Sequence, residues 1–175
     1  MEGTLEIQDL LACEHLRDLQ FTWVEPEEIE SPYQELLCHK RDMTSTLARF
    51  HGGEVGLKVL QEPLDQECYV REVLLKVGEK PVEYGLIRVF LENFPKELRA
   101  EITGGLKPLG AILNDSGFGY SSEPGGFLKI PGETFEPDFF PAAGSKFLFG
   151  RYNSLLSEDR TVLARIIEIL PREKS

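Results

Sequence analysis

The chain has 175 residues, a hydrophobic fraction of 41% and a formal net charge of −11, with 30 acidic residues against 19 lysines and arginines. This length and apolar content suffice for one folded domain with its own core, so disorder is not expected. The negative charge argues against nucleic acid and against a membrane surface as partners, because both are bound through a basic face.

The first predicted element is a helix over residues 4–21, where apolar side chains recur at helical spacing. This helix either packs on the rest of the chain or forms an oligomer contact, so a homodimer is left open. Residues 25–32 contain four glutamates and two prolines, which is typical of a loop. Ser31 followed by Pro32 favours the start of a short helix that runs to about Lys40.

A further helix and a strand follow this short helix. Asp42 or Thr44 is suited to cap the N-terminus of the helix, and the glycine pair at 52–53 ends it. A strand is expected over residues 54–60.

The clearest pattern lies between residues 69 and 94, where two strands are expected to meet at a turn over residues 78–80. Odd-numbered residues of the first strand share one face, and all of them except Arg71 are apolar or aromatic. Arg71 is therefore expected to point inward. Because an unpaired buried charge costs several kcal/mol or more, its guanidinium requires a carboxylate from the protein or from a ligand.

Between this hairpin and the C-terminus we expect two short helices, a loop and three strands. The loop is predicted over residues 117–126, which are rich in glycine and serine but lack the spacing of a phosphate-binding loop. A mobile flap is the alternative for this segment. The helices are predicted over 95–104 and 107–113, and the strands over 127–130, 146–156 and 161–170.

The last strand repeats the anomaly of Arg71, because Glu168 shares a face with four apolar residues. The structural explanation is an ion pair between Arg71 and Glu168, or a bulge that turns one of them to solvent. The functional explanation is an arginine that binds a ligand carboxylate beside an acid whose pKa is raised by desolvation. Both explanations remain open at this point.

Five short motifs occur in a fixed order along the chain. They are DMT at 42–44, VREVLL at 70–75, KPLG at 107–110, FGR at 149–151 and LP at 170–171. Together they resemble the chorismate lyase family (chorismate pyruvate-lyase, 4-hydroxybenzoate synthase), in particular a compact prokaryotic branch of it. The ligand domain of some bacterial transcription regulators has a similar strand pattern.

The resemblance implies an α+β fold, in which an antiparallel six-stranded sheet carries packed helices and helical flaps close over an internal ligand site. It implies one chorismate lyase-like domain over residues 1–175. The implied activity is that of a lyase, which eliminates pyruvate from chorismate to give 4-hydroxybenzoate. Aromatisation drives this reaction, so neither a metal nor another cofactor is expected, and the partner is a small-molecule carboxylate.

The resemblance also assigns site residues. Arg71 matches the arginine that grips the ring carboxylate, and Met43 and Leu109 match the residues that line its pocket. Glu168 most nearly matches the family glutamate, and it would share a proton with the departing ether oxygen.

Two departures from the family pattern bear on activity. Counted from the terminal proline, Glu168 is one residue out of step, which reverses its face unless a bulge intervenes. The second family arginine is displaced by two positions to Arg88, and either Arg88 or Arg151 would bind the second carboxylate. The alternative function is therefore a binding domain without turnover, which holds an aromatic or isoprenoid acid through Arg71.

The sequence contains no pattern for export or for membrane insertion, so we expect a cytoplasmic protein. Its first residues are acidic, and no apolar run approaches the roughly 18 residues that span a membrane. Cys13, Cys38 and Cys68 are widely spaced and form no C-x-x-C pair. We therefore expect neither a disulfide framework nor a zinc site.

Overall fold

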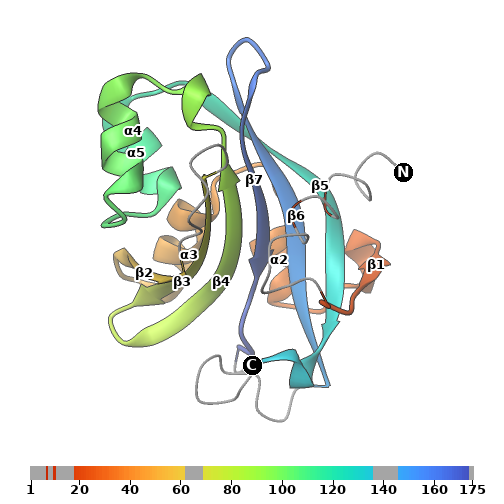
Figure 1. The fold of residues 1–175 in the computed structure, drawn as a ribbon. Coiled ribbons are helices and arrows are strands. Elements are labelled where there is room, and N and C mark those ends of the chain that lie inside the picture. Colours follow the sequence, from red (N-terminus) through yellow and green to blue (C-terminus); the bar gives the residue numbers. More distant parts are fainter. Residues whose placement is uncertain (1–6, 8–9, 11–17, 62–68, 136–145, 174–175) are drawn as a thin grey trace.

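The chain is built on one antiparallel sheet of seven strands (Figure 1). The computed structural model describes residues 7, 10, 18–61, 69–135 and 146–173. Within these residues the strands lie side by side in the order β1-β5-β6-β7-β4-β3-β2. The strands are β1 (Thr22–Val24), β2 (Val55–Gln61), β3 (Tyr69–Val77), β4 (Lys80–Val89), β5 (Tyr120–Pro131), β6 (Phe147–Ser157) and β7 (Val162–Ile169).

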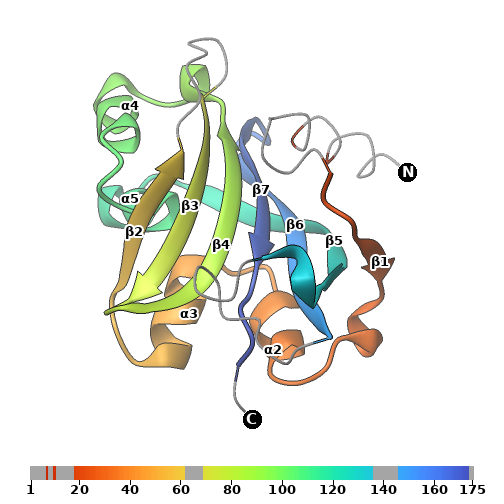
Figure 2. The ribbon, with the colours of Figure 1, turned by 60° about the horizontal axis from the view of Figure 1, so that its bottom comes forward.

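Two pairs of helices lie against the sheet at different places (Figures 1 and 2). The helices are α2 (Tyr33–Leu37), α3 (Met43–His51), α4 (Lys96–Thr103) and α5 (Leu109–Ser116), and short 3-10 turns occur at Pro26–Glu28, Leu91–Asn93 and Gly132–Thr134. None of the described helices is long and apolar enough to cross a membrane.

The buried apolar side chains form three clusters on the two faces of the sheet. One cluster joins α4 and α5 to β4, β6 and β7, and a second joins α2 and α3 to β3, β4 and β6. The third cluster lies on the opposite face of the sheet. It includes the residues of β4 and β7 whose side chains point to that face, such as Leu86 and Ile167. The helix-covered face is therefore divided into two apolar regions, and the candidate site lies between them.

The helix that begins after Asp42 is confirmed, and its ends explain its length. The side chain of Asp42 accepts a hydrogen bond from Ser45 N at 2.7 Å, and Gly52 ends α3 in the left-handed conformation with φ of 70°. An N-cap acid satisfies a free backbone N–H, and glycine adopts positive φ without a steric penalty. These two residues determine where α3 begins and where it ends.

The hairpin of β3 and β4 is also confirmed. Gly78 adopts φ of 58° in the turn, and the strands pair with Arg71 opposite Ile87. The expected helix over residues 4–21 falls mostly outside the described residues. The helix expected to run to Lys40 ends at Leu37 instead.

The expectation of six strands and of a loop over residues 117–126 is wrong. Strand β5 begins at Tyr120 and pairs with β6 along its length, and β1 adds a short seventh strand at its other edge. Aromatic rings occupy the space above its two glycines. A Cβ atom at Gly125 would lie 2.8 Å from the ring of Tyr152, and one at Gly126 would lie 2.4 Å from that of Trp23. The absence of a side chain at these two glycines therefore lets aromatic rings pack against the strand, and the glycines do not mark a loop.

Candidate functional site

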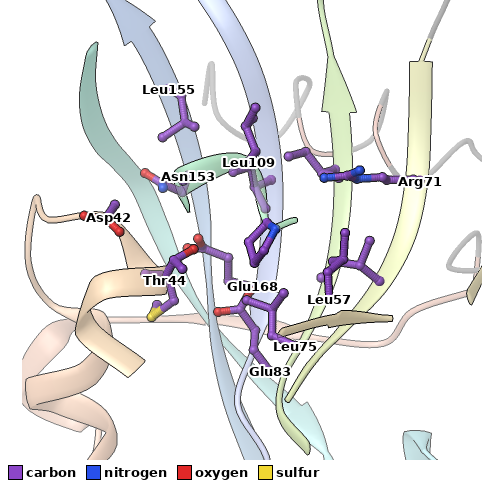
Figure 3. A pocket seen from close by; sticks show the side chains of 17 residues that line it. Asp42, Thr44, Leu57, Arg71, Leu75, Glu83, Leu109, Asn153, Leu155 and Glu168 are labelled. Atoms are coloured by element: carbon purple, nitrogen blue, oxygen red, sulfur yellow. The ribbon is translucent and has the colours of Figure 1, made fainter. Parts of the chain in front are cut away.

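A cavity of about 50 Å³ lies on the helix-covered face of the sheet, between the two apolar clusters (Figure 3). The first residues of α3 and α5 line it on one side, and β2, β3, β4, β6 and β7 supply the rest of its lining. A water molecule needs about 10–15 Å³ of such space, so the cavity holds about three to five waters or a ligand of a few heavy atoms.

The pairing of the central strands brings the lining side chains together. Gly85 on β4 lies opposite Val73 on β3 and opposite Glu168 on β7. Gly85 has no side chain, and a Cβ atom there would lie 3.0 Å from Val73 Cγ2 and 3.6 Å from Glu83 Oε1. A side chain at this position would therefore crowd Val73, which packs closely over the glycine.

Arg71 lies inside the protein, as its place on β3 predicts, and its side chain is 1% exposed. Its Nη1 donates a hydrogen bond to Ile102 O at the end of α4, over 3.1 Å. Its Nε has no hydrogen-bond partner, and Arg71 forms no ion pair with another described residue. Its guanidinium carbon lies 5.9 Å from the centre of the Tyr69 ring. Arg71 therefore presents a buried positive charge to the cavity without a carboxylate of its own.

Arg151 is the second buried arginine of this face, and its donors are occupied by protein groups. Its Nε donates to Glu168 Oε2, and its Nη1 donates to Leu37 O at 3.2 Å and to His39 O at 2.9 Å. Its Nη2 reaches Arg41 O at 3.4 Å. The ion pair that the sequence suggested for Glu168 is thus formed with Arg151 instead of Arg71. It ties the segment between α2 and α3 to the sheet.

Glu83 is a buried acid that the sequence analysis did not single out. Its side chain lines the cavity, and its Oε2 has no hydrogen-bond partner among the residues that the structure describes. Burial, and then the charge of Glu168, raise the pKa of Glu83 well above the ordinary glutamate value, and Arg151 opposes this shift in part. The reasoning applied to Arg71 could have found it, because Glu83 alternates with Gly85 and Ile87 on one face of β4.

Four of the residues proposed from the sequence lie around this cavity. Arg71, Met43, Leu109 and Glu168 all line it. The first comes from β3, the second and third from the starts of α3 and α5, and the last from β7. Asp42, at the start of α3, lines it as well. Within the described chain, no group of three histidine, cysteine or acidic side chains could hold a metal ion.

The two arginines expected to bind a second carboxylate lie elsewhere or are already bound. Arg88 pairs with Arg165 of β7, and its guanidinium carbon lies 5.1 Å from the centre of the Phe90 ring. It is next to Ile87, which lines the cavity, so it points to the opposite face of β4. Arg151 lies beside the cavity, but it donates to Glu168 and to backbone carbonyls.

The buried carboxyl of Glu83 leads to a prediction for stability. Its pKa is higher in the folded chain than in the unfolded chain, so folding takes up a proton once the pH exceeds the ordinary glutamate value of about 4.3. The contribution of Glu83 to the free energy of unfolding is therefore fully present below that pH. It is lost as the pH rises toward the raised pKa of Glu83. We expect Glu83→Gln to be more stable than the wild type, by a margin that grows from pH 5 upward. Urea unfolding at several pH values measures this margin.

Glu79→Gln is the matched control for that measurement, because Glu79 lies on the surface at the tip of the same hairpin. Its only described ion pair is with Lys76, at 3.0 Å. We expect its stability to follow that of the wild type across this pH range. Parallel pH profiles for Glu83→Gln and the wild type would contradict the assignment of Glu83 as a buried, protonated acid.

Comparison of the sequence with family descriptions and with curated proteins gave no match. Solved structures do match. PhnF from Mycobacterium smegmatis has a TM-score of 0.56 and 12% identity, over 75% of this chain and 64% of PhnF, so the chain spans less than two thirds of that protein. The separate effector domain of PhnF has a TM-score of 0.54 and 11% identity, over 74% of this chain and 88% of that domain.

A third match is the ligand-binding domain of a putative GntR-family transcriptional regulator from Bordetella bronchiseptica. It has a TM-score of 0.43 and 11% identity, over 70% of this chain and 90% of that domain. At such low identities, a likeness to solved structures shows the fold alone. The coarser expectation of an α+β chain with one antiparallel sheet is confirmed.

The expectation of a chorismate lyase is wrong. The structures that match with TM-scores above 0.5 are PhnF and its effector domain, and neither is named as a lyase. The arginine nearest Glu168, Arg151, is held by protein groups and does not offer its donors to a second carboxylate.

Proposed function

We propose that this chain is a ligand-binding domain, which holds a small molecule by its carboxylate and does not transform it. The observation that carries this proposal is Arg71. Its guanidinium is buried at the cavity, its Nε is unbonded, and no described carboxylate pairs with it. A buried charge without a partner costs free energy, and a ligand carboxylate would offset that cost. Residues 1–175 would form this one domain.

The start of α5 adds to the preference for an anion. Leu109 and Gly110 line the cavity, and the residue before them, Pro108, provides no side-chain cap to this helix. The first N–H groups of a helix have no partner within the helix, and the helix dipole makes this end positive. A carboxylate near Arg71 would therefore meet favourable electrostatics from both the guanidinium and the helix.

The size of the cavity limits the ligand. Its volume of about 50 Å³ suits a carboxylate of a few heavy atoms, such as acetate or propionate. A larger acid would require the starts of α3 and α5 to separate, since these two segments lie against each other. A Cβ atom at Gly110, for example, would lie 2.9 Å from Thr44 Oγ1.

A comparison of acids with their amides tests this function. We expect acetate, propionate or butyrate to raise the melting temperature, while the amide of equal size has no effect, because an amide carries no charge to pair with Arg71. At about 100 times the dissociation constant, a ligand stabilises by ~2.7 kcal/mol, which corresponds to about 5–10 °C for a chain of this length. Differential scanning fluorimetry and isothermal titration calorimetry measure the two effects. Equal responses to acids and amides, or no response to any acid at millimolar concentration, would refute the proposal.

A further inference from the structure

The cavity has a positive side and a negative side (Figure 3). Arg71 enters it from β3, and the acids Asp42, Glu83 and Glu168 enter it from α3, β4 and β7. Glu83 lies opposite Leu75, four residues along β3 from Arg71. At about 3.3 Å per residue, the backbone positions of the arginine and this acid are roughly 13 Å apart along the strands. The two side chains lean over the cavity from separate ends.

The acidic end contains a group without a partner. Glu83 is 4% exposed, and its Oε2 is bonded to no described group. Arg151 is the cation nearest to these acids, but its donors are directed to Glu168 and to backbone carbonyls. A buried acceptor without a donor costs free energy, which a donor group on a ligand would recover.

The charges around the cavity cancel when Glu83 carries its proton. Arg71 and Arg151 contribute two positive charges, and the carboxylates of Asp42 and Glu168 contribute two negative charges. The charge of Asp42 is already engaged at the start of α3, where it accepts from Ser45 N. A simple carboxylate adds a negative charge to this site, whereas a ligand that also carries an ammonium group adds no net charge.

We propose that the ligand is a small amino acid, whose carboxylate binds Arg71 and whose ammonium group binds Glu83 beside Glu168. This inference rests on the proposed function, because it assigns the second end of the ligand in the same site. An ammonium group supplies several donors and a positive charge. It would therefore satisfy the unbonded oxygen of Glu83 as well as the nearby carboxylate of Glu168.

Binding of the ammonium group is coupled to the proton of Glu83. The charged groups that act on Glu83 are Glu168 on β7 and Arg151 on β6, and Asp42, before α3, and Arg71, on β3, line the same cavity. A ligand cation beside these acids favours the ionised form of Glu83, which then releases its proton to the buffer. The affinity for the amino acid should accordingly rise with pH across the range in which Glu83 titrates.

The test compares each amino acid with the acid that lacks only its amine. The pairs are glycine with acetate, β-alanine with propionate, and 4-aminobutyrate with butyrate, and 3-hydroxypropionate replaces the amine by a hydroxyl. We expect at least one amino acid to bind the wild type about tenfold more tightly than its partner, because charge-assisted hydrogen bonds are the stronger ones. Titration calorimetry in two buffers of different ionisation enthalpy should show proton release. Glu83→Gln should lose both the preference and the proton release, and Glu79→Gln should keep both.

The outcomes separate this inference from the proposed function. If acids with and without the amine bind equally, the inference is overturned while the carboxylate site stands. It is overturned as well if the hydroxy acid matches the amino acid, or if Glu83→Gln keeps the full preference. If neither acids nor amino acids bind, both proposals are wrong.

Discussion

Replacement of Arg151 by Met is expected to lower the free energy of unfolding by about 3–5 kcal/mol. The ion pair of Arg151 with Glu168 is buried, with side chains 0% and 5% exposed. The substitution would leave the carboxylate of Glu168 in the interior without its cation. It would also remove the donors of Leu37 O and His39 O, which hold the segment between α2 and α3. Chemical denaturation of the purified protein measures the loss.

Two controls show whether the lost pair is the cause. Arg160→Met removes an exposed arginine of the turn between β6 and β7 that pairs with Glu123 on β5, and we expect little change because surface ion pairs contribute little. In the double variant Arg151→Met with Glu168→Gln, the stranded charge is removed as well. The double variant should therefore be less destabilised than the sum of the two single variants. Strict additivity, or a stable Arg151→Met protein, would contradict a structural role for this arginine.

Replacement of Arg71 by Met is expected to weaken the binding of small carboxylates by about 10- to 100-fold. Hydrogen bonds to charged groups contribute about 1.5–3 kcal/mol, and each 1.4 kcal/mol corresponds to a factor of ten. The loss of stability should be smaller than that of Arg151→Met, because Arg71 has one described hydrogen bond, to Ile102 O, and no ion pair to break. Titration calorimetry with the best acid of the panel gives the affinity, and denaturation gives the stability.

Arg88→Met is the matched control for Arg71→Met, since Arg88 lies on the opposite face of β4 and does not line the cavity. It should bind carboxylates as the wild type does. Arg71→Lys should keep part of the affinity, because lysine retains the charge but not the planar fork of the guanidinium. If Arg71→Met binds the carboxylate with wild-type affinity, the carboxylate does not bind at Arg71.

Arg71 and Arg151 illustrate why burial alone does not identify a ligand-binding residue. Both are almost fully buried on the same face of the sheet. Arg151 directs its donors to Glu168 and to three backbone carbonyls, so it stabilises the fold. Arg71 has an Nε without a described partner and lines the cavity, which is why we propose it as the residue that binds the ligand.

Local patterns predicted much of the fold. The period of two over residues 69–77 correctly indicated a strand with Arg71 inward. Asp42 and the glycine at 52 marked the ends of α3, because a cap and a left-handed terminus are properties of single residues. The glycine-rich segment after 117 was misinterpreted, because rings from β1 and β6 decide its conformation.

The resemblance of short motifs to chorismate lyases predicted four side chains around one cavity but misjudged the protein class. Met43, Arg71, Leu109 and Glu168 do line the same cavity. The structures matched with TM-scores above 0.5, PhnF and its effector domain, are not named as lyases. Similar backbones can carry different functions, so the function has to be argued from the site.

The sequence by itself determined the secondary structure of the hairpin, the ends of α3 and the presence of in-line charges at Arg71 and Glu168. These features depend on alternation along one strand and on the preferences of single residues. Only the tertiary structure decided that Glu168 pairs with Arg151, that Arg88 faces away and that Glu83 is buried with an oxygen that no described group bonds. The reason is physical: a charged side chain is bound or unbonded according to the groups that other strands and helices bring beside it.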